Sequence, residues 1–174
     1  DTQALEVLRA QVAAMPRRPL VSVVMPTYNA NLVWLEEAIV SVQNQTYGDW
    51  ELCIADDAST DPAVRPFLEQ QAARDARIKL VFRETNGHIS VATNSALSVA
   101  SGEWFTFLDH DDILPPHALQ YMVRAAMEQP NARLIYSDED KIDEHGRRHD
   151  PYFKSDWNPD LFYAHNLVTH LAFY

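Results

Sequence analysis

Three carboxylates and a histidine directly follow one short apolar run of the chain. The run at residues 104–108 (WFTFL) is rich in aromatic residues, which is typical of a strand buried on both faces. The next four residues are Asp109, His110, Asp111 and Asp112. Carboxylates this close repel one another unless a cation neutralises them. Because ligands bind at the carboxyl ends of strands in open α/β sheets, the run predicts a divalent-metal site.

A simpler interpretation is an aspartate-rich turn. Asp112 precedes Ile113, Leu114 and two prolines, so its carboxylate could cap a helix that starts there. The two interpretations differ in whether the acids bind a ligand or only shape the chain.

The composition limits the classes of function. The 174 residues are 47% hydrophobic and 22% charged, as in an ordinary globular domain. The net charge of -11 disfavours binding to nucleic acid or to anionic membrane surfaces. Cys53 is the single cysteine, so a disulfide within the chain and a zinc site of several thiolates are excluded. The sequence has no apolar run of membrane-spanning length and no signal-peptide core.

Strand-like and helix-like patterns alternate along the chain. A helical spacing at residues 2–14 ends in prolines, which predicts a helix and linker at 1–19 and a main domain at 20–174. The predicted strands are residues 20–25, 50–55, 78–82, 103–108 and 133–137. The predicted helices are residues 32–45, 62–74, 89–100 and 116–128, and a hairpin turn is predicted around Gly146. The alternation predicts an α/β fold with a mostly parallel sheet flanked by helices.

Polar residues follow four of these strands. They are Pro26, Thr27, Tyr28 and Asn29 after the first, Asp56 and Asp57 after the second, residues 109–112 after the fourth and residues 138–140 after the fifth. In a parallel sheet these ends would share one edge and line one cleft. Neither a dinucleotide-binding glycine motif nor a P-loop is present, so a phosphate there would be held mainly by metal.

Several motifs occur together in an order that resembles the family 2 glycosyltransferases, which have the GT-A fold. They are VSVVMPTYN at 21–29, SVQNQT at 41–46, DDASTD at 56–61, NG at 86–87, Asn94, ASGE at 100–103 and DHDD at 109–112. YSDEDK at 136–141 and FKSDW at 153–157 resemble the bacterial branch that builds surface polysaccharides such as O-antigen.

The resemblance implies a nucleotide-binding set. Its members are Pro26, Thr27, Tyr28, Asn29, Asp56, Asp57, His88, Asn94, Asp109 and His110. Tyr28 would lie against the base and Asp57 would accept its imide hydrogen, whereas Asp56 could instead cap a turn. Asp109 and His110 would lie near the ribose and phosphates, where His88 could add a basic contact. Many relatives have arginine just before the position of Asn94, where this chain has Thr93.

The resemblance also implies the metal site and the reaction. Asp111, with Asp109, would hold Mn²⁺ or Mg²⁺, hard cations suited to carboxylate and phosphate oxygens. The sugar of a UDP, dTDP or GDP donor would pass, with inversion, to a hydroxyl of a glycan or lipid-linked glycan. The expected location is the cytoplasm, at the inner face of the membrane through the acceptor or other domains.

Both ends of the sequence resemble cuts, because it starts without methionine and stops within an apolar pattern. We therefore expect a GT-A fold truncated on its C-terminal side, which binds the donor. The catalytic base is expected beyond Tyr174, and Asp138, Glu139 and Asp140 would at most help to bind donor or acceptor.

Two other classes remain open from the sequence. A non-catalytic nucleotide-sugar binding module would share the same cleft. A phosphotransferase of the haloacid dehalogenase type also places a DxD motif after a buried strand. That family expects threonine or valine two residues past the second aspartate, where this chain has Ile113, and it places the motif after the first strand.

Overall fold

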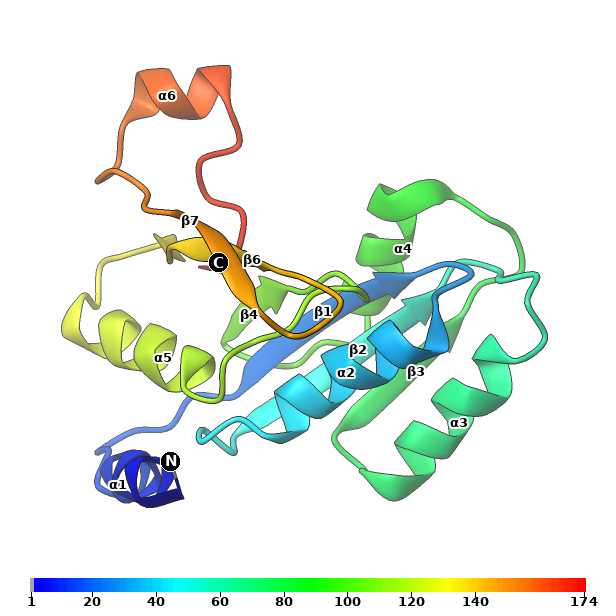
Figure 1. Cartoon of the computed structure of the whole chain (residues 1–174), viewed down its shortest axis with the longest axis horizontal. Coiled ribbons are helices and arrows are strands. Elements are labelled where there is room, and N and C mark those ends of the chain that lie inside the picture. The colour runs from blue at the N-terminus through cyan, green and yellow to red at the C-terminus, as the bar shows by residue number, and fades with distance from the viewer. Residues whose placement is uncertain (1) are drawn as a thin grey trace.

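The computed structural model describes residues 2–174, and its centre is a parallel four-stranded sheet in the order β3-β2-β1-β4 (Figure 1). The strands are β1 (Val21–Thr27), β2 (Trp50–Asp56), β3 (Ile78–Phe82) and β4 (Trp104–Phe107). Val23 pairs with Leu52 on one side and with Thr106 on the other. The predicted parallel sheet and the four strands that build it are confirmed.

Helices cover both faces of this sheet (Figure 1). They are α2 (Leu32–Gln43), α3 (Val64–Arg74), α4 (His88–Leu97) and α5 (Ala118–Glu128). Alternate residues of the strands bury against α2, α3 and α5 on one face, as Val23 and Leu52 do. The residues between them, such as Val24 and Cys53, pack against α4 on the other face. This period of two is what a sheet covered on both faces requires.

Two predictions about single strands are wrong. β1 continues through Pro26 to Thr27, because the position of Pro26 faces β4 and β4 has already ended there. β4 is only partly buried at three of its four residues, since α4 lies over β1 and β2. The ring of Tyr174 covers Phe105 instead, with the ring centroids 5.6 Å apart.

The predicted fifth strand does not join the parallel sheet. β5 (Ile135–Tyr136) pairs antiparallel with β8 (Ala172–Phe173), near the end of the chain. β6 (Glu139–Ile142) and β7 (Arg148–Tyr152) form the hairpin predicted around Gly146. A short helix, α6 (Pro159–Ala164), stands away from the body between β7 and β8 (Figure 1). The acids at 138–140 therefore enter a hairpin and do not end a strand of the main sheet.

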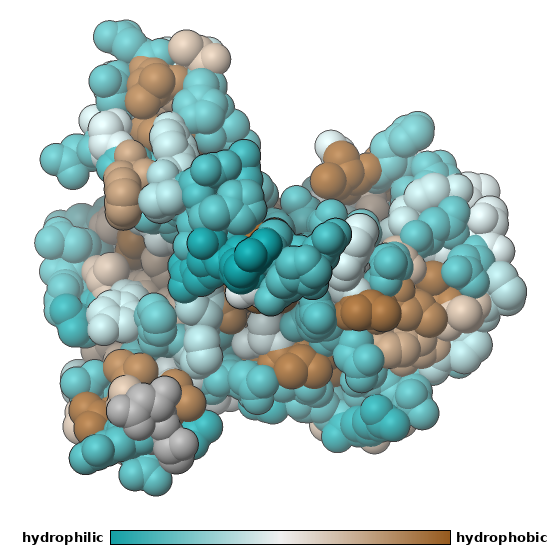
Figure 2. Space-filling view, viewed as in Figure 1, coloured by the Kyte–Doolittle hydropathy of each residue, from teal (hydrophilic) through white to brown (hydrophobic). Residues whose placement is uncertain are grey.

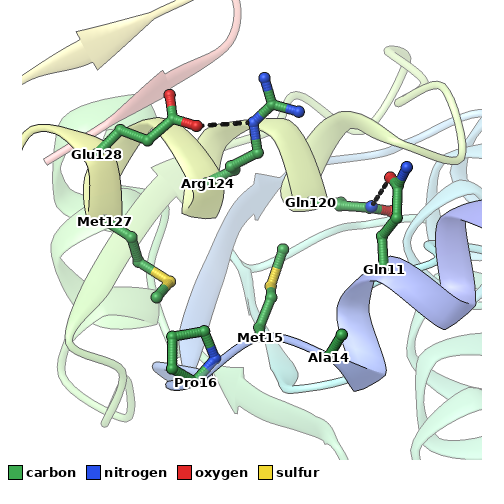
Figure 3. A pocket seen from close by; sticks show the side chains of 8 residues that line it. All are labelled: Gln11, Ala14, Met15, Pro16, Gln120, Arg124, Met127 and Glu128. Atoms are coloured by element: carbon green, nitrogen blue, oxygen red, sulfur yellow. Dashed lines mark hydrogen bonds and ion pairs between the residues drawn. The ribbon is translucent and has the colours of Figure 1, made fainter.

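The first helix packs on the domain through α5. In α1 (Thr2–Ala13) Val12 is 4% exposed, and Gln120 of α5 donates a hydrogen bond to Gln11 at 3.2 Å. Met15 and Met127 face each other across a cavity of about 380 Å³ (Figure 3). Across residues 2–174, none of the helices has the length and apolar character that crossing a membrane would require.

A buried polar cluster joins the strands near their amino ends, on the α4 face. Ser22 donates to Glu51 at 2.7 Å, and the Lys79 ammonium lies 2.6 Å from the same carboxylate. The amide and hydroxyl of Ser101 also donate to Glu51, at 2.5 and 2.9 Å. Burial alone would raise the pKa of Glu51, but the hydrogen bonds from Lys79, Ser101 and Ser22 outweigh it and lower the pKa to about 2. The cluster therefore stays ionised at neutral pH.

Gly102 belongs to the same cluster for a steric reason. Its amide donates to the Ser22 hydroxyl at 2.8 Å. A Cβ atom at this position would lie 2.6 Å from that hydroxyl oxygen and 2.7 Å from the carbonyl oxygen of Leu20. The ASGE motif at 100–103 thus stabilises the amino edge of the sheet, which is the edge opposite the predicted ligand cleft.

Glu51→Gln tests the buried cluster. We expect it to lower the free energy of unfolding by about 3 kcal/mol near neutral pH, because Lys79 loses its charged partner. Since the folded pKa lies below the ordinary 4.5, this stabilisation is complete above pH 4.5 and disappears as the pH falls toward about 2. Urea unfolding across this range should show the difference between wild type and variant narrowing.

The control is Glu69→Gln, which removes an exposed pair with Arg65. It should change the free energy of unfolding by less than about 0.5 kcal/mol. A Glu51→Gln effect that is equally large at neutral pH and near pH 3 would contradict the linkage.

Candidate functional site

The polar loops of all four parallel strands meet at the carboxyl edge of the sheet, where Asp57 is buried beside the partly buried side chain of Arg83. Asp57 follows β2, is 2% exposed, and accepts a hydrogen bond from the Arg83 Nε at 2.7 Å. The Gly87 amide donates to both carboxylate oxygens of Asp57 at 3.0 Å. Arg83 also donates to the Ser95 hydroxyl in α4, at 2.8 Å. These contacts fix a carboxylate and a guanidinium side by side near the ends of β2 and β3.

Asn29 and Asp56 hold the neighbouring loop in place. Asn29 receives hydrogen bonds on its side-chain oxygen from the amides of Thr60 and Asp61, at 2.8 and 3.1 Å. Asp56 accepts one from the Ser59 amide at 3.2 Å, together with a very short one from the Ser59 hydroxyl. Asp56 therefore caps a turn, which is the alternative that the sequence left open.

Tyr28 differs from these two residues, because its side chain is free to meet a ligand. It is 44% exposed at the end of β1. The two residues before it, Pro26 and Thr27, are buried in β1, so the backbone that leads to Tyr28 is fixed in the sheet.

Two residues predicted to contact the nucleotide have side chains that form no hydrogen bond or ion pair within residues 2–174. His88 is exposed and is the first residue of α4. Its φ of +63° is a backbone conformation that residues other than glycine rarely adopt outside functional loops. Asn94 is exposed on the second turn of α4. Neither side chain forms a hydrogen bond or ion pair with another described residue, so both remain available.

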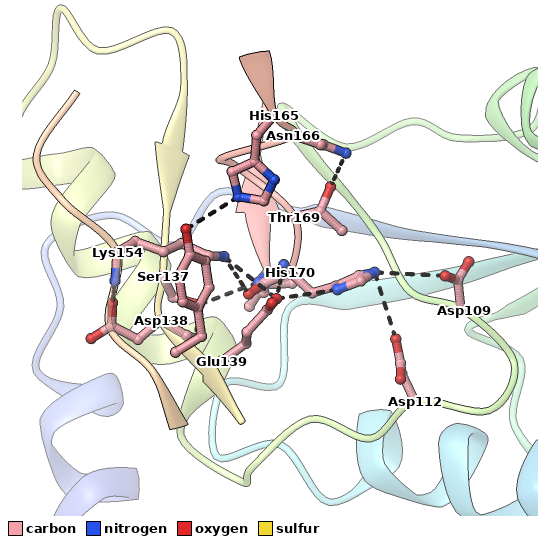
Figure 4. Close-up of polar contacts among 12 residues, drawn as sticks. Asp109, Asp112, Ser137, Asp138, Glu139, Lys154, His165, Asn166, Thr169 and His170 are labelled. Atoms are coloured by element: carbon pink, nitrogen blue, oxygen red, sulfur yellow. Dashed lines mark hydrogen bonds and ion pairs between the residues drawn. The ribbon is translucent and has the colours of Figure 1, made fainter. Parts of the chain in front are cut away.

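A second cluster forms where the loop after β4 meets the segment before β8 (Figure 4). The His170 Nε2 lies 3.7 Å from a carboxylate oxygen of Asp109 and 3.8 Å from one of Asp112. All three ligand atoms lie within 4.8 Å of one another. These separations are too long for direct hydrogen bonds, yet they match two atoms bound to one cation, which lie roughly 3–4 Å apart.

The electrostatics of this cluster favour a cation. The interaction with His170 lowers the pKa of Asp109. Burial, together with the charges of Asp109, Asp111 and Glu139, raises the pKa of Asp112 despite His170. One imidazole therefore does not neutralise the carboxylates around it, and a divalent ion would do so more completely.

Glu139 and Lys154 tie the other side of His170 to the hairpin. The His170 Nδ1 lies 3.2 Å from Glu139, whose carboxylate also receives a very short bond from the His170 amide. The side chain of Lys154 is 1% exposed, and its ammonium lies 3.6 Å from Glu139 and donates to the His170 carbonyl at 2.9 Å. Burial would raise the pKa of Glu139, but the bond from His170 and the charge of Lys154 outweigh it and lower the pKa.

The structure distributes the aspartates of the DHDD run differently from the expectation. Asp112 does not cap a helix, because α5 starts at Ala118 with His117 as its N-cap residue. Asp111 is exposed and forms no hydrogen bond or ion pair within residues 2–174, and it lies outside the three-residue cluster. His110 is half-buried beside Asp109. Asp111 is thus the carboxylate of this run that is open to a ligand.

The SVQNQT run positions the loop that carries these aspartates. Gln45 donates to the Pro115 carbonyl at 2.8 Å and accepts from the Leu119 amide at 3.0 Å. Ser41 accepts from the Leu114 amide at 3.1 Å. Backbone groups without helical partners before and in the first turn of α5 are thereby satisfied by the end of α2. The loop after β4 is fixed by residues about seventy positions earlier in the chain.

Comparison with known proteins identifies the class. The fold is that of the GT-A glycosyltransferases. The chain belongs to glycosyl transferase family 2, whose model matches residues 22–174. This finding confirms the resemblance and rules out the haloacid dehalogenase alternative.

Individual relatives are much longer than this chain. It is 48% identical over 171 residues to the uncharacterized protein y4gI of Sinorhizobium fredii, covering 96% of this chain and 19% of that protein. It is 40% identical to the O-antigen biosynthesis protein RfbC of Myxococcus xanthus, covering 91% of this chain and 12% of that protein. It is similar to S. aureus TarS 1-349 in complex with UDP-GlcNAc, with a TM-score of 0.61, 27% identity, and coverage of 73% and 36% of the two chains.

Sequence reasoning missed three residues of the site. Arg83 follows β3 directly, so the rule that found Asp57 at the end of β2 could have found it. Gln45 lies inside a motif to which the sequence assigned no role. His170 carries no local signal, because it lies in an irregular loop and meets Asp109 only through the fold.

Gln45→Ala tests the support of the loop after β4. We expect it to lower the free energy of unfolding by about 2–4 kcal/mol, because the buried Leu119 amide loses its partner and the Pro115 carbonyl keeps only the bond from the Ala118 amide. Urea unfolding measures this loss. Gln70→Ala on the exposed side of α3 is the matched control, and it should stay within about 0.5 kcal/mol of wild type. Equal effects of the two substitutions would show that Gln45 has no special role.

Proposed function

We propose that the chain binds a nucleotide-diphospho-sugar and serves the transfer of its sugar to a hydroxyl group of a glycan. The observation that carries this proposal is the meeting of two clusters at one edge of the sheet. Tyr28, Asp57 and Arg83 form the side suited to a base, and Asp109, Asp112 and His170 form the side suited to a cation. A nucleoside diphosphate has a flat base at one end and two phosphates at the other, and so matches this order.

The base side suits a pyrimidine. The exposed ring of Tyr28 can cover the face of the base. Asp57 keeps lone pairs beyond those used by Arg83 and Gly87, with which it can accept an imide N–H, while Arg83 can donate to a base carbonyl. The similar S. aureus TarS structure is a complex with UDP-GlcNAc, which favours UDP over dTDP and GDP as the carrier.

The cation side fits Mn²⁺ or Mg²⁺. Two carboxylates and one imidazole at the observed separations are a reasonable donor set, and the imidazole favours Mn²⁺. We propose Asp109, Asp112 and His170 as ligands and retain Asp111 as a further carboxylate for the same ion. When bound, the cation would stabilise the charge that develops on the departing diphosphate.

The residues of the chain then bind and orient the donor. Tyr28 and Asp57 hold the base, and the loop held by Gln45 presents the diphosphate side. In a single displacement, the acceptor oxygen bonds to the anomeric carbon while the carbon–oxygen bond to the diphosphate breaks with its electron pair. The configuration at that carbon inverts, and a carboxylate base takes the hydroxyl proton.

We assign that base to none of the acids at 138–140. Glu139 is held by His170 and Lys154, Asp140 by Arg148 at 2.6 Å, and Asp138 by the Lys154 amide at 2.8 Å. The lowered pKa of Glu139 also makes it a weak base. These contacts occupy the three acids, so we propose that residues 1–174 bind the donor and that turnover needs a carboxylate from elsewhere. They equally keep open a role as a nucleotide-sugar binding module without catalysis.

The setting follows from the proposed donor and the relatives. A nucleotide-sugar donor, the single free thiol of Cys53 and a similarity to an O-antigen biosynthesis protein favour work in the cytoplasm on a glycan or lipid-linked glycan. The acceptor would then bring the protein to the inner face of the membrane.

Tyr28→Ala tests the base site. We expect UDP affinity in the presence of Mn²⁺ to fall at least about tenfold, because base–aromatic stacking is worth about 1–3 kcal/mol. Isothermal titration calorimetry on the chain measures this loss. Tyr163→Ala is the matched control, because Tyr163 is 89% exposed on α6. If UDP binds both variants as it binds wild type, Tyr28 does not contact the base; if UDP does not bind wild type, the donor site is wrong.

A series of single substitutions tests the cation site. We expect Asp112→Asn and His170→Gln each to lower Mn²⁺ affinity at least about tenfold, because each removes one ligand. The electron paramagnetic resonance signal of free Mn²⁺ reports this affinity without any need for turnover. Glu144→Gln, at an 87% exposed side chain in the hairpin turn, should leave it unchanged.

Asp111→Asn separates the two possible ligand sets. A loss for Asp111→Asn alone, with normal affinity in Asp112→Asn and His170→Gln, would make Asp111 the anchor and contradict the three-residue set. Losses in all three variants would place the four side chains around one ion.

A further inference from the structure

His170 is held by two residues whose motifs have no part in the proposed function. Glu139 belongs to YSDEDK at 136–141, and Lys154 belongs to FKSDW at 153–157. The pairing of β6 with β7 brings the two motifs side by side. Both residues contact His170 from the side of the hairpin (Figure 4). The question is what these contacts do for the imidazole.

Three polar atoms of His170 have partners on this side. Its backbone amide and its ring Nδ1 both meet the same carboxylate oxygen of Glu139, the amide through a very short bond and Nδ1 at 3.2 Å. Its carbonyl oxygen accepts a hydrogen bond from the Lys154 ammonium at 2.9 Å. The backbone and the ring are thus fixed together, and these two residues leave the Nε2 atom free.

Lys154 holds Glu139 as a charged carboxylate. The surface of the hairpin is hydrophilic (Figure 2), yet the Lys154 side chain is only 1% exposed. A buried ammonium needs an anionic partner. Among residues 2–174, Glu139 is the acid that lies within ion-pair distance of this ammonium, at 3.6 Å. Each of the two charges therefore keeps the other ionised.

An ionised Glu139 determines where the imidazole carries its proton. A carboxylate only accepts hydrogen bonds, so its contact with Nδ1 is favourable when Nδ1 carries the proton. In the neutral ring, Nε2 then has the free lone pair with which histidine binds a metal. Nε2 is also the atom that faces Asp109 and Asp112, at 3.7 and 3.8 Å. Three atoms with lone pairs thus converge, and a cation between them would satisfy all three.

Without Glu139, the same surroundings favour the other tautomer. Asp109 and Asp112 also accept hydrogen bonds, so a proton on Nε2 would find acceptors on their side. A protonated Nε2 cannot bind a metal. Glu139 competes with these two carboxylates for the imidazole proton, and its bond to the His170 amide holds it in place for this competition.

We propose that Glu139 is a positioning residue for the cation. It keeps the proton of His170 on Nδ1, fixes the ring relative to the backbone, and so presents the Nε2 lone pair beside Asp109 and Asp112. Lys154 keeps Glu139 charged and holds the His170 carbonyl. This inference rests on the proposed function, because it takes His170 as a ligand of the cation.

The first readout is the tautomer of His170, which ¹⁵N NMR of the ring nitrogens reports. The chain has seven histidines, and the His170 signals are those that His170→Gln removes. In the metal-free chain at alkaline pH, where the imidazole is neutral, we expect the proton on Nδ1. Glu139→Ala should move it to Nε2. Glu139→Gln, whose amide oxygen can still accept both bonds, should keep it on Nδ1.

The second readout is Mn²⁺ affinity, from the electron paramagnetic resonance signal of the free ion. Glu139→Ala should lower it at least about tenfold and Glu139→Gln by less than about threefold, because only the first removes the group that orients the ligand. Glu144→Gln is the matched control, since Glu144 lies beside the exposed His145 in the same hairpin. It should change neither the tautomer nor the affinity.

Urea unfolding accompanies both readouts, because both Glu139 variants leave Lys154 without its charged partner. We expect both to be less stable than wild type, so a loss of stability alone does not support the proposal. Glu139→Asp covers the case in which Glu139→Ala does not fold. It keeps the charge but shortens the reach by one methylene, so it should lower Mn²⁺ affinity at least about fivefold.

Each contrary outcome has its own meaning. If Glu139→Ala keeps the proton on Nδ1 and binds Mn²⁺ as wild type does, Glu139 does not position His170, and the proposed ligand set stands. If Glu139→Ala and Glu139→Gln lose affinity equally, Glu139 acts through its charge and the inference is wrong. If His170→Gln binds Mn²⁺ as wild type does, the proposed ligand set is wrong and this inference falls with it.

Discussion

One imidazole surrounded by carboxylates is the interaction on which the site depends. His170 brings Asp109 and Asp112, which follow the last parallel strand, into contact with Glu139 of the hairpin. Like charges this close would otherwise drive these segments apart. The buried ammonium of Lys154 adds a second positive charge behind Glu139. The imidazole and the ammonium balance the negative charge of these carboxylates only in part, and the proposed divalent cation would neutralise the remainder.

Polar contacts stabilise both edges of the sheet, but only the carboxyl edge also carries side chains that are open to a ligand. At the amino edge, the buried carboxylate of Glu51 bonds to Ser22, Lys79 and Ser101, at the opposite end of the strands from the proposed donor site. At the carboxyl edge, Asn29, Asp56 and Gln45 use their side chains to fix loops. Among the described residues, the groups left free there include the Tyr28 ring, the Asp111 carboxylate and the side chains of His88 and Asn94. The loops that carry these free groups are thus fixed by other side chains, as rigid binding sites require.

Sequence patterns predicted the parts of the fold that depend on local periodicity. The strand at Ile78–Phe82 has the predicted bounds, and the other parallel strands and their helices differ only at their ends. Predictions failed where a contact between distant residues decides the structure. β5 left the parallel sheet because it pairs with β8, and Asp112 turned toward His170 instead of a helix. A rule of polar strand ends located Asp57 and Asp109, whereas nothing near His170 in the sequence indicates its partners.

The last residues of the chain have a consequence for solubility. Tyr174 exchanges backbone hydrogen bonds with Phe105 at 3.0 and 3.3 Å, and its ring stacks on that of Phe105. β4 is one of the two outer strands of the parallel sheet, and its sequence, WFTF, is largely aromatic and uncharged. An uncovered edge of this kind pairs readily with the edge of another molecule. The pairing with Tyr174 therefore covers this aromatic edge of the sheet. A chain that lost the pairing would expose β4 and would tend to aggregate through it.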